Sequence, residues 1–224
     1  MNKKFVTTTY QLEKCLPSEP QADCLRFVFV SDLHNVLYGT GNQYLLQEIE
    51  RQNPDAVLVG GDTLVGKPGY PMDVAMDFVK NVAGRFPVYY ANGNHEYRLR
   101  IYPEVYGDMY DRFLEALQEA GVHHLVNRTV QIKFRGVPVA IHGFEAERKY
   151  YHRFKDVEMP ILELERIFGQ PDPEQYHILL AHNPAYKDTY LEWGADVTLS
   201  GHCHGGVVRF GEHYGLVSPI MKLF

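Results

Sequence analysis

The chain has 224 residues, of which 45% are hydrophobic and 13% aromatic, and 28 acidic against 22 basic side chains give it a net charge of −6. This composition is typical of a globular protein and excludes an intrinsically disordered chain, and the length predicts a single domain over residues 1–224. The negative charge argues against electrostatic gathering of DNA or RNA, so strong nucleic-acid binding is not expected.

The first residues and the cysteines predict a cytoplasmic location. Lys3 and Lys4 lie near the start of the chain, but polar residues at 7–9 and 11 interrupt the apolar stretch that a secretory signal needs. No apolar run approaches the roughly 20 residues that span a bilayer. The three cysteines form no CxxC motif and leave one unpaired in any disulfide scheme, which favours a reducing compartment. Peripheral contact with a membrane surface stays open as an alternative.

Short apolar runs rich in Val, Ile, Leu, Phe and Tyr recur along the chain, and each is typical of a strand buried on both faces. They lie at residues 25–30, 56–59, 87–91, 137–141, 177–181 and 196–199. Helical patterns lie between several of them, at 44–51, 72–83 and 109–120. Asn42 is expected to cap the first of these helices. The alternation of strand and helix predicts an α/β fold.

The alternation loosens after Gly121. Apolar runs at 122–126, 129–134 and 137–141 follow one another, with turns at Asn127 and Gly136. That succession is typical of a β meander and predicts a second, mixed sheet. The charged, Tyr-rich stretch that follows, at 145–154, is expected to run over the surface near the mouth of the functional site.

Nearly every potential metal ligand follows directly on the end of a predicted strand. These side chains are Asp32 and His34 after the first run, Asp62 after the second, Asn94 and His95 after the third, His182 after the fifth, and His202 and His204 after the sixth. In α/β sheets, ligands bind at the edge formed by the carboxyl ends of the strands. We therefore expect five strand ends to bring these side chains to one edge.

The residue types indicate a metal. Carboxylate oxygen, amide oxygen and imidazole nitrogen together suit Mn, Fe and Zn ions. Each motif alone has a structural alternative as a turn, a cap or a satisfied core histidine. The segment GHCHGG at 201–206 is the most specific piece, because alternating histidines flanked by glycines have few structural uses. The occurrence of all the motifs in order favours the functional interpretation.

The ordered motifs carry a family resemblance. They are Ser-Asp-Leu-His at 31–34, Gly-Gly-Asp at 60–62, Gly-Asn-His-Glu at 93–96, the lone His182, and Gly-His-Cys-His-Gly-Gly at 201–206. Together they resemble the calcineurin-like metallophosphoesterases over residues 25 to about 217. Within this superfamily, Gly-Gly-Val-Val-Arg at 205–209 and the segment 7–12 look like the bacterial phosphoesterases that include UDP-diacylglucosamine pyrophosphatases.

The resemblance implies a four-layer αββα sandwich of two mixed β-sheets flanked by helices, with two metal ions at the carboxyl ends of the strands. Carried over position by position, it implies one ion held by Asp32, His34 and His204, a second held by Asn94, His182 and His202, and a bridge between them at Asp62. A carboxylate suits the bridge because its two oxygens can serve cations about 3.5 to 4 Å apart. The ions are expected to be Mn, Fe or Zn.

The expected reaction is hydrolysis of a phosphodiester or pyrophosphate bond by a hydroxide that bridges the two metals. His95 is the candidate that protonates or stabilises the departing oxygen. The expected substrate is a phosphorylated small molecule or a nucleotide-linked lipid, and no protein partner is implied. A phosphomonoesterase and a noncatalytic scaffold on the same fold are the alternatives, although a scaffold should have lost some ligands. The acidic charge disfavours a nuclease.

Other residues near the motifs have two interpretations, a substrate mouth or solvated surface, and the second is favoured for most. They are Tyr97, Arg98, Arg100, Tyr102, Arg148, Tyr150, Tyr151 and Arg153. Glu96 is expected to fix its loop instead of touching metal. His123 and His124 are expected to lie far from the motifs as structural or surface residues. The sequence stops twenty residues after His204, where relatives of this type continue, so a truncated C-terminus is expected.

Overall fold

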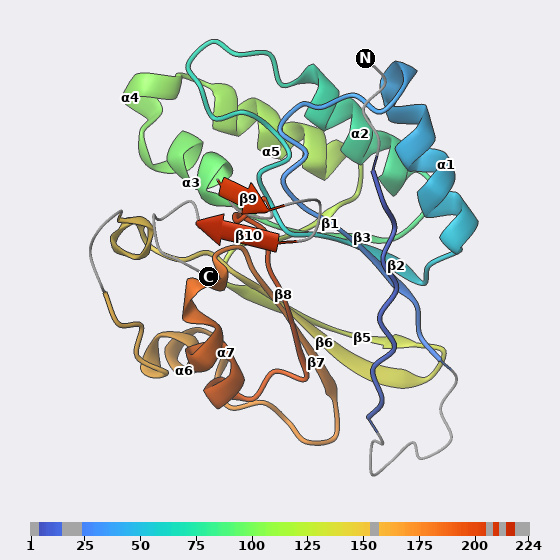
Figure 1. Cartoon of the computed structure of the whole chain (residues 1–224), viewed down its shortest axis with the longest axis vertical. Coiled ribbons are helices and arrows are strands. Elements are labelled where there is room, and N and C mark those ends of the chain that lie inside the picture. The colour runs from blue at the N-terminus through green and yellow to red at the C-terminus, as the bar shows by residue number, and fades with distance from the viewer. Residues whose placement is uncertain (1–4, 15–23, 153–156, 205–207, 211–213, 218–224) are drawn as a thin grey trace.

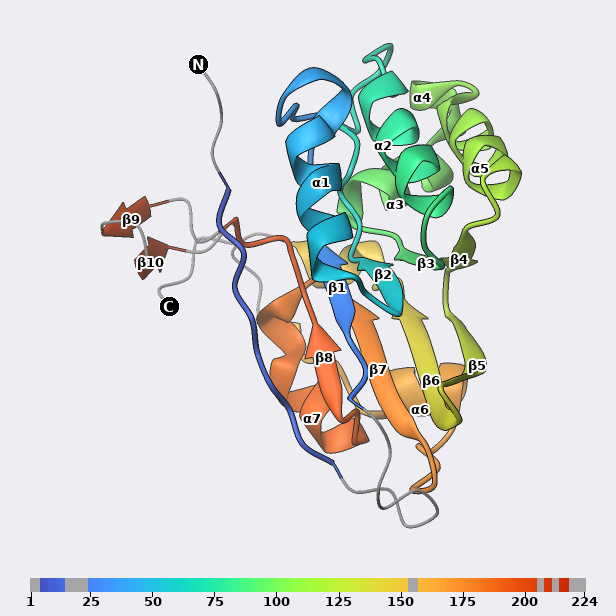
Figure 2. The same ribbon diagram turned by 90° about the vertical axis from the view of Figure 1, so that its right-hand side faces the viewer.

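The structure, a computed structural model, describes residues 5–14, 24–152, 157–204, 208–210 and 214–217. Two four-stranded β-sheets pack against each other, and helices cover the outer face of each sheet (Figure 1, Figure 2). The layers therefore run helix, sheet, sheet, helix, which confirms the expected α/β sandwich.

The first sheet is parallel throughout its described strands. Its order is β1 (Phe27–Val30), β2 (Ala56–Val59), β3 (Val88–Ala91) and β4 (His123–Leu125). The connecting helices are α1 (Gln43–Gln52), which follows a short turn of 3₁₀ helix at Thr40–Asn42, then α2 (Asp73–Ala83), α3 (Asn94–Ile101), α4 (Pro103–Tyr106) and α5 (Met109–Glu119). Because each helical crossover returns the chain in the same direction, the expectation that this sheet is mixed is wrong for the described strands.

The second sheet is mixed, as expected. Its order is β5 (Arg128–Phe134), β6 (Val137–Phe144), β7 (Tyr176–Ala181) and β8 (Val197–Leu199). The first pair is antiparallel and the other two are parallel. Its outer helices are α6 (Leu162–Phe168) and α7 (Lys187–Trp193), with 3₁₀ turns at Arg148–Tyr151 and Pro184–Tyr186. A separate antiparallel pair follows, β9 (Val208–Phe210) and β10 (Tyr214–Val217).

The predicted β meander is wrong at its first strand. His123–Leu125 pairs in parallel with β3, because α5 returns the chain to the first sheet, and only β5 and β6 form a hairpin. The chain changes sheets at Asn127, where φ is 51°. The hairpin turn lies at Arg135 and Gly136, whose φ values of 50° and 88° match the pair of positive angles that a type I′ turn requires.

The apolar runs are continuous because each parallel strand is buried on both faces. In β2, Val57 and Val59 pack in the core under the helices, whereas Ala56 and Leu58 pack in the core between the sheets. Residues of the second sheet such as Leu180 complete that inner core. The two sheets therefore share one apolar layer, which holds their strand ends in a fixed relation.

Several helices differ from the sequence prediction. Helices α3, α4, α6 and α7 were not predicted, and α3 is strongly polar, with no apolar stripe of its own to signal a helix. Asn42 does not cap α1: it has a left-handed backbone, with φ at 61°, and its Oδ1 accepts from the N–H of Tyr38. None of the helices in the described part of the chain combines the length and apolarity that a bilayer crossing demands.

A buried pair of histidines lies under α7, away from the predicted ligands. Thr129 Oγ1 lies 2.8 Å from His142 Nδ1, His142 Nε2 lies 2.9 Å from His177 Nδ1, and His177 Nε2 lies 2.8 Å from the carbonyl of Asp172. Because the carbonyl can only accept, His177 Nε2 donates to it, and with His177 Nδ1 as an acceptor the donors run from Thr129 through His142 to Asp172. Burial, with the neighbouring His177, lowers the pKa of His142 to about 3.

We predict that His142 makes the fold sensitive to mild acid. In the unfolded chain this ring takes up a proton near pH 6.5, whereas the folded ring stays neutral, so stability falls as pH drops below about 6.5. In His142→Gln, which can still accept from Thr129 and donate to His177, the free energy of unfolding should fall less steeply between pH 6.5 and 4, by about 1 kcal/mol per pH unit. Urea unfolding at several pH values measures both slopes, and equal slopes would contradict the assignment.

Candidate metal centre

Five strand ends bring the predicted ligands to one edge of the sandwich. Asp32 and His34 follow β1, Asp62 follows β2, and Asn94 follows β3, all from the first sheet; His182 follows β7, and His202 and His204 follow β8, from the second sheet. The shared inner core sets these two groups of strand ends beside each other. This edge is the one that the sequence pattern predicts.

The ligand loops have an unusual backbone. Among the described residues, ten residues other than glycine have positive φ, and five of these are predicted ligands: Asp32, His34, Asp62, His202 and His204. Such conformations are uncommon for residues with a Cβ and cluster at functional sites, where surrounding contacts hold them. Here Asp32 N–H donates to Gly61 O and His34 N–H donates to Asp62 O, both at 3.0 Å. The strained backbone therefore indicates that these loops are held in the conformation that brings their side chains to the edge.

Two glycines allow the loops of Asp62 and Asn94 to touch. A Cβ on Gly61 would lie 2.0 Å from the backbone nitrogen of Gly93, and one on Gly93 would lie 2.2 Å from Asp62 Oδ1. Both distances are far below a van der Waals contact. The glycines of the two motifs are thus required by the close approach of the loops.

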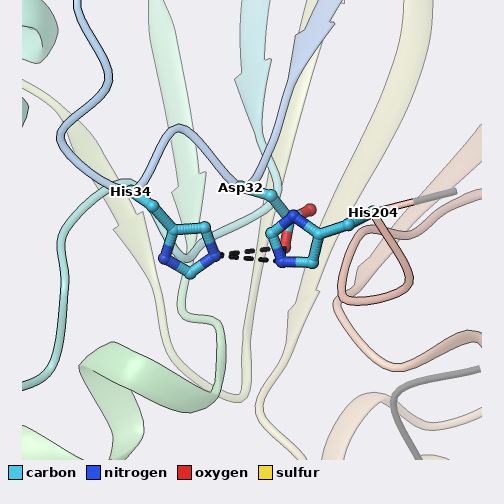
Figure 3. Close-up of side chains that lie close together, drawn as sticks. All are labelled: Asp32, His34 and His204. Carbon is cyan, nitrogen blue, oxygen red and sulfur yellow. Dashed lines mark hydrogen bonds and ion pairs between the residues drawn. The ribbon is translucent and has the colours of Figure 1, made fainter. Parts of the chain in front are cut away.

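One group of potential ligands consists of Asp32, His34 and His204 (Figure 3). His204 Nε2 lies 3.4 Å and His34 Nε2 lies 3.8 Å from Asp32 Oδ1. The two imidazole nitrogens are 3.1 Å apart. Three donor atoms of the types that bind Mn, Fe or Zn thus converge on one point.

A second group consists of Asp62, His182 and His202. His182 Nε2 lies 3.1 Å from Asp62 Oδ2. The same carboxylate oxygen lies 3.9 Å from His34 Nε2 and 3.9 Å from His95 Nε2. Asp62 therefore lies between the two groups and within reach of histidines from both sheets.

Among the buried atoms that make no hydrogen bond within the described residues, two belong to predicted ligands. They are Asn94 Oδ1 and His182 Nε2. His182 Nδ1 lies 2.6 Å from the carbonyl of Gly60, which can only accept, so Nδ1 carries a proton and Nε2 is the nitrogen whose lone pair the ring would offer to a cation. Buried polar atoms without partners are costly, and a cation would satisfy both. The residues present thus fit a metal.

The electrostatics of the edge centre on Asp62. Burial opposes its ionisation, but His182 and His95 hold the pKa of this carboxyl well below its usual range. Burial likewise opposes the charging of His182, but Asp62 outweighs it and raises the pKa of His182 to about 9. The interior here therefore holds an ionised carboxylate, and its negative field favours a cation beside it.

Glu96 holds the Asp62 loop from behind. Its buried carboxylate accepts the N–H of Asp62 at 2.8 Å, of Thr63 at 3.0 Å and of Gly93 at 2.9 Å, and the hydroxyl of Tyr90 at 2.8 Å. Burial, together with the Asp62 carboxylate, raises the pKa of Glu96. Glu96 thus contacts the backbone of two ligand loops, the position expected of a residue that fixes the loop.

His95 is oriented by a residue that the sequence did not indicate. Its ring Nδ1 accepts the backbone N–H of Gly66 at 2.7 Å, and the backbone N–H of His95 donates to Asp62 Oδ1 at 2.7 Å. Gly66 thus orients the ring, and no motif marks the loop that contains Gly66. Burial lowers the pKa of His95 to about 4. The ring is therefore neutral, and because Nδ1 accepts, its proton is on Nε2.

A buried polar network that the sequence analysis missed supports the Asn94 loop. Asn92 Nδ2 donates to Glu145 Oε1 at 2.8 Å, and Asn92 Oδ1 lies 2.8 Å from His124 Nε2. Arg100 pairs with Glu145. His124 is thus not far from the motifs, and Glu145, at the start of the stretch expected to run over the surface, is buried and part of the support. These four residues come from separate stretches of chain, so no local pattern could reveal them.

A cavity of about 560 Å³ adjoins the edge at Asn94 and His202. Of the aromatic and basic residues considered for a substrate mouth, it is lined by Tyr97, Arg98, Tyr102, Arg148 and Tyr151. Arg100 instead pairs with Glu145, and Tyr150 is buried with its hydroxyl donating to Glu163. Arg153 lies outside the described residues. These five residues therefore lie beside the edge; Arg148 is exposed, as the favoured interpretation expects, and the other four are partly buried.

We predict that Glu96→Gln lowers both the folding stability of the protein and the affinity of the sheet edge for metal. Both oxygens of Glu96 accept hydrogen bonds, so the amide NH₂ of Gln must face a donor and leave it unsatisfied, at a cost of about 1 to 3 kcal/mol. Urea unfolding should show this loss, and metal affinity should fall with it. Glu115→Gln, the same change at an exposed position of α5, is the control. Equal stability of the two variants would exclude the role of Glu96.

Comparisons with known proteins agree with this geometry. The sequence model described as calcineurin-like phosphoesterase matches residues 25–206. The uncharacterised Bacillus subtilis protein YpbG is 30% identical over 92% of this chain and 70% of its own length. An uncharacterised metallophosphoesterase of Aquifex aeolicus is 28% identical over 85% of this chain and 67% of its own length.

A solved structure shares the fold. The phosphopantetheinyl hydrolase of Mycobacterium tuberculosis superposes with a TM-score of 0.54 at 17% identity, covering 84% of this chain and 86% of its own. The family implies divalent metal ions, and the grouped side chains at the strand ends are candidates to hold them. The chain therefore belongs to the calcineurin-like phosphoesterase family and is a metal-dependent phosphoester hydrolase.

Proposed function

We propose that this chain, as a single domain, hydrolyses a phosphodiester or pyrophosphate bond at a centre of two metal ions. The ligand sets are Asp32, His34 and His204 for one ion and Asn94, His182 and His202 for the other, with Asp62 shared. The observation that carries the proposal is the position of Asp62 Oδ2, 3.1 Å from His182 Nε2 and 3.9 Å from His34 Nε2. One carboxylate thus contacts a histidine of each set.

The side chains divide the chemical work. When bound, a pair of Mn, Fe or Zn ions would supply Lewis acidity that acidifies water and offsets the charge of the phosphate. Asp62 would orient the pair with its two oxygens, while the carbonyl of Gly60 holds the His182 ring with its lone pair inward. The two sheets hold all of these groups in place before substrate binds, which lowers the cost of reorganisation during the reaction.

His95 is proposed to act on the leaving group. Its Nδ1 is occupied by the N–H of Gly66, so Nε2 carries the proton and faces the Asp62 side of the centre, 3.9 Å from that carboxylate. A neutral imidazole N–H fixed in this way can donate to an oxygen on which negative charge develops. We therefore assign the Nε2–H of His95 to a hydrogen bond with the departing oxygen.

The substrate is proposed to be either a phosphodiester, with an organic group on each side of the phosphate, or a pyrophosphate, with an organic group next to the phosphate that is attacked. The cavity next to Asn94 and His202 supports this, because it leaves room for such a group. The UDP-diacylglucosamine pyrophosphatase type is the subgroup we favour within the family, with a nucleotide-linked lipid as substrate. A phosphomonoesterase and a scaffold are the alternatives that turnover measurements decide.

We predict that purified protein incubated with Mn²⁺ binds two ions per chain and hydrolyses bis(p-nitrophenyl) phosphate faster than p-nitrophenyl phosphate. Asp62→Asn removes the charge shared by both ions, so it should lower the metal content below one ion per chain and abolish turnover. Elemental analysis and p-nitrophenol release are the measurements. Asp111→Asn, at an exposed site on α5, is the matched control. Two ions without any turnover would favour the scaffold.

A second variant separates metal binding from proton donation. His95→Asn should retain both metals but lose about a hundredfold or more in turnover of diesters with poor leaving groups, because a hydrogen bond to the developing negative charge on the departing oxygen contributes this much. With p-nitrophenolate, which needs little protonation, the loss should be smaller. His123→Asn, an exposed histidine on β4, is the control. An equal loss for good and poor leaving groups would exclude His95 as the acid.

A further inference from the structure

The cavity beside the centre follows one face of α3. Asn94, Tyr97, Arg98 and Ile101 all line it, and their spacing of three, four and seven residues places them on the same side of the helix. At a rise of 1.5 Å per residue, this wall extends about 10 Å from Asn94. The cavity volume of about 560 Å³ falls in the range of sites for small organic ligands.

Tyrosine rings form much of the remaining wall. Tyr102 and Tyr106 on or next to α4 lie beyond Ile101, and Tyr151 meets the ring of the predicted ligand His202 edge-on, with ring centroids 5.5 Å apart. Tyr97 is held by the backbone N–H of Arg148, which donates to its hydroxyl at 3.1 Å, and the hydroxyl of Tyr106 donates to Gly66 O at 3.3 Å. Rigid aromatic walls suit a flat ring in the ligand.

The cavity is also locally positive in a chain whose net charge is −6. Arg98 and Arg148 line it, and none of its described lining residues is acidic. The Arg148 guanidinium lies over the Tyr102 ring, 5.4 Å from its centroid. Arg98 has no ion-pair partner within the described residues, and its Nε is buried without a hydrogen bond. A buried N–H of this kind is costly unless a ligand satisfies it.

Arg98 lies on the same face of α3 as the proposed ligand Asn94 and near His95, on whose ring its charge acts. It lies one turn beyond Asn94, about 6 Å along the helix axis. A guanidinium presents a planar fork that matches a carboxylate or a phosphate. An anion that Arg98 binds in addition to the scissile phosphate would be a second group of the same ligand.

We propose that the cavity binds the organic part of the substrate and that Arg98 binds a second anionic group on that part. The inference rests on the proposed function and names its substrate class: a small phosphoester or pyrophosphate whose organic part carries a flat ring and a carboxylate or further phosphate. The second anion, held by Arg98, selects this class over uncharged aryl or alkyl esters.

The test compares two esters that differ in one group, phenyl p-nitrophenyl phosphate and carboxyphenyl p-nitrophenyl phosphate. The Mn²⁺-loaded protein should prefer the carboxylated ester by about tenfold in kcat/KM, mostly through KM, as expected for one charge-assisted hydrogen bond. Arg98→Gln should bring this ratio close to one, and Arg98→Lys should restore part of it. Because each ratio is measured on one preparation, the active fraction cancels.

Arg112→Gln removes an exposed arginine from α5 and should leave the ratio unchanged. A ratio near one in the unaltered protein would overturn the proposal. So would the same ratio in Arg98→Gln and the unaltered protein, which would mean that Arg98 acts on the scissile phosphate or on folding.

A binding measurement tests the inference apart from turnover. Calorimetry with chelator-treated protein should show tighter binding of carboxyphenylphosphonate than of phenylphosphonate, and Arg98→Gln should lose that preference. If no ester is hydrolysed but this preference is found, the proposed function fails while the anion site stands. Equal binding of the two phosphonates would overturn the anion site even if both esters are hydrolysed.

Discussion

Two buried carboxylates at one sheet edge set the conditions for the rest of the structure. Asp62 and Glu96 are both almost completely buried, and each makes the charge of the other less favourable. Glu96 is stabilised by three backbone N–H groups and a tyrosine hydroxyl. Asp62 is surrounded by histidines instead, and such an anion needs positive charge beside it. The centre is thus a place where the fold concentrates negative charge and leaves metals to neutralise it.

The fold holds the predicted ligands at this edge through strained backbone conformations and through close contact between two loops. Five predicted ligands have left-handed backbones, and the loops of Gly61 and Gly93 touch with no room for a Cβ on either. Asn94 Oδ1 and His182 Nε2 remain buried without hydrogen bonds. Each feature costs stability in the absence of a ligand, and the apolar layer shared by the two sheets supplies the rigidity that maintains them. The same helix that begins at Asn94 then lines the cavity beside the site.

Sequence patterns predicted those parts of the molecule that local chemistry determines. Runs such as Ala56–Val59 predicted buried strands, and the ligands after them predicted a common edge, because parallel strands end on the same side. Contacts between distant residues could not be predicted in this way. Whether His123–Leu125 joins the first or the second sheet depends on the path of α5, and the link from Asn92 to Glu145 and His124 joins three separate segments. The partial burial of Arg98 likewise depends on how α3 packs, which its polar sequence does not show.

The central claim is that Asp62 is shared by two metal ions, and anomalous X-ray diffraction from crystals grown with Mn²⁺ tests it most directly. The account predicts two anomalous peaks about 3.5 to 4 Å apart, on either side of the Asp62 carboxylate. One peak should lie among Asp32, His34 and His204, and the other among Asn94, His182 and His202. A single peak, or two peaks of which one does not contact Asp62, would contradict it.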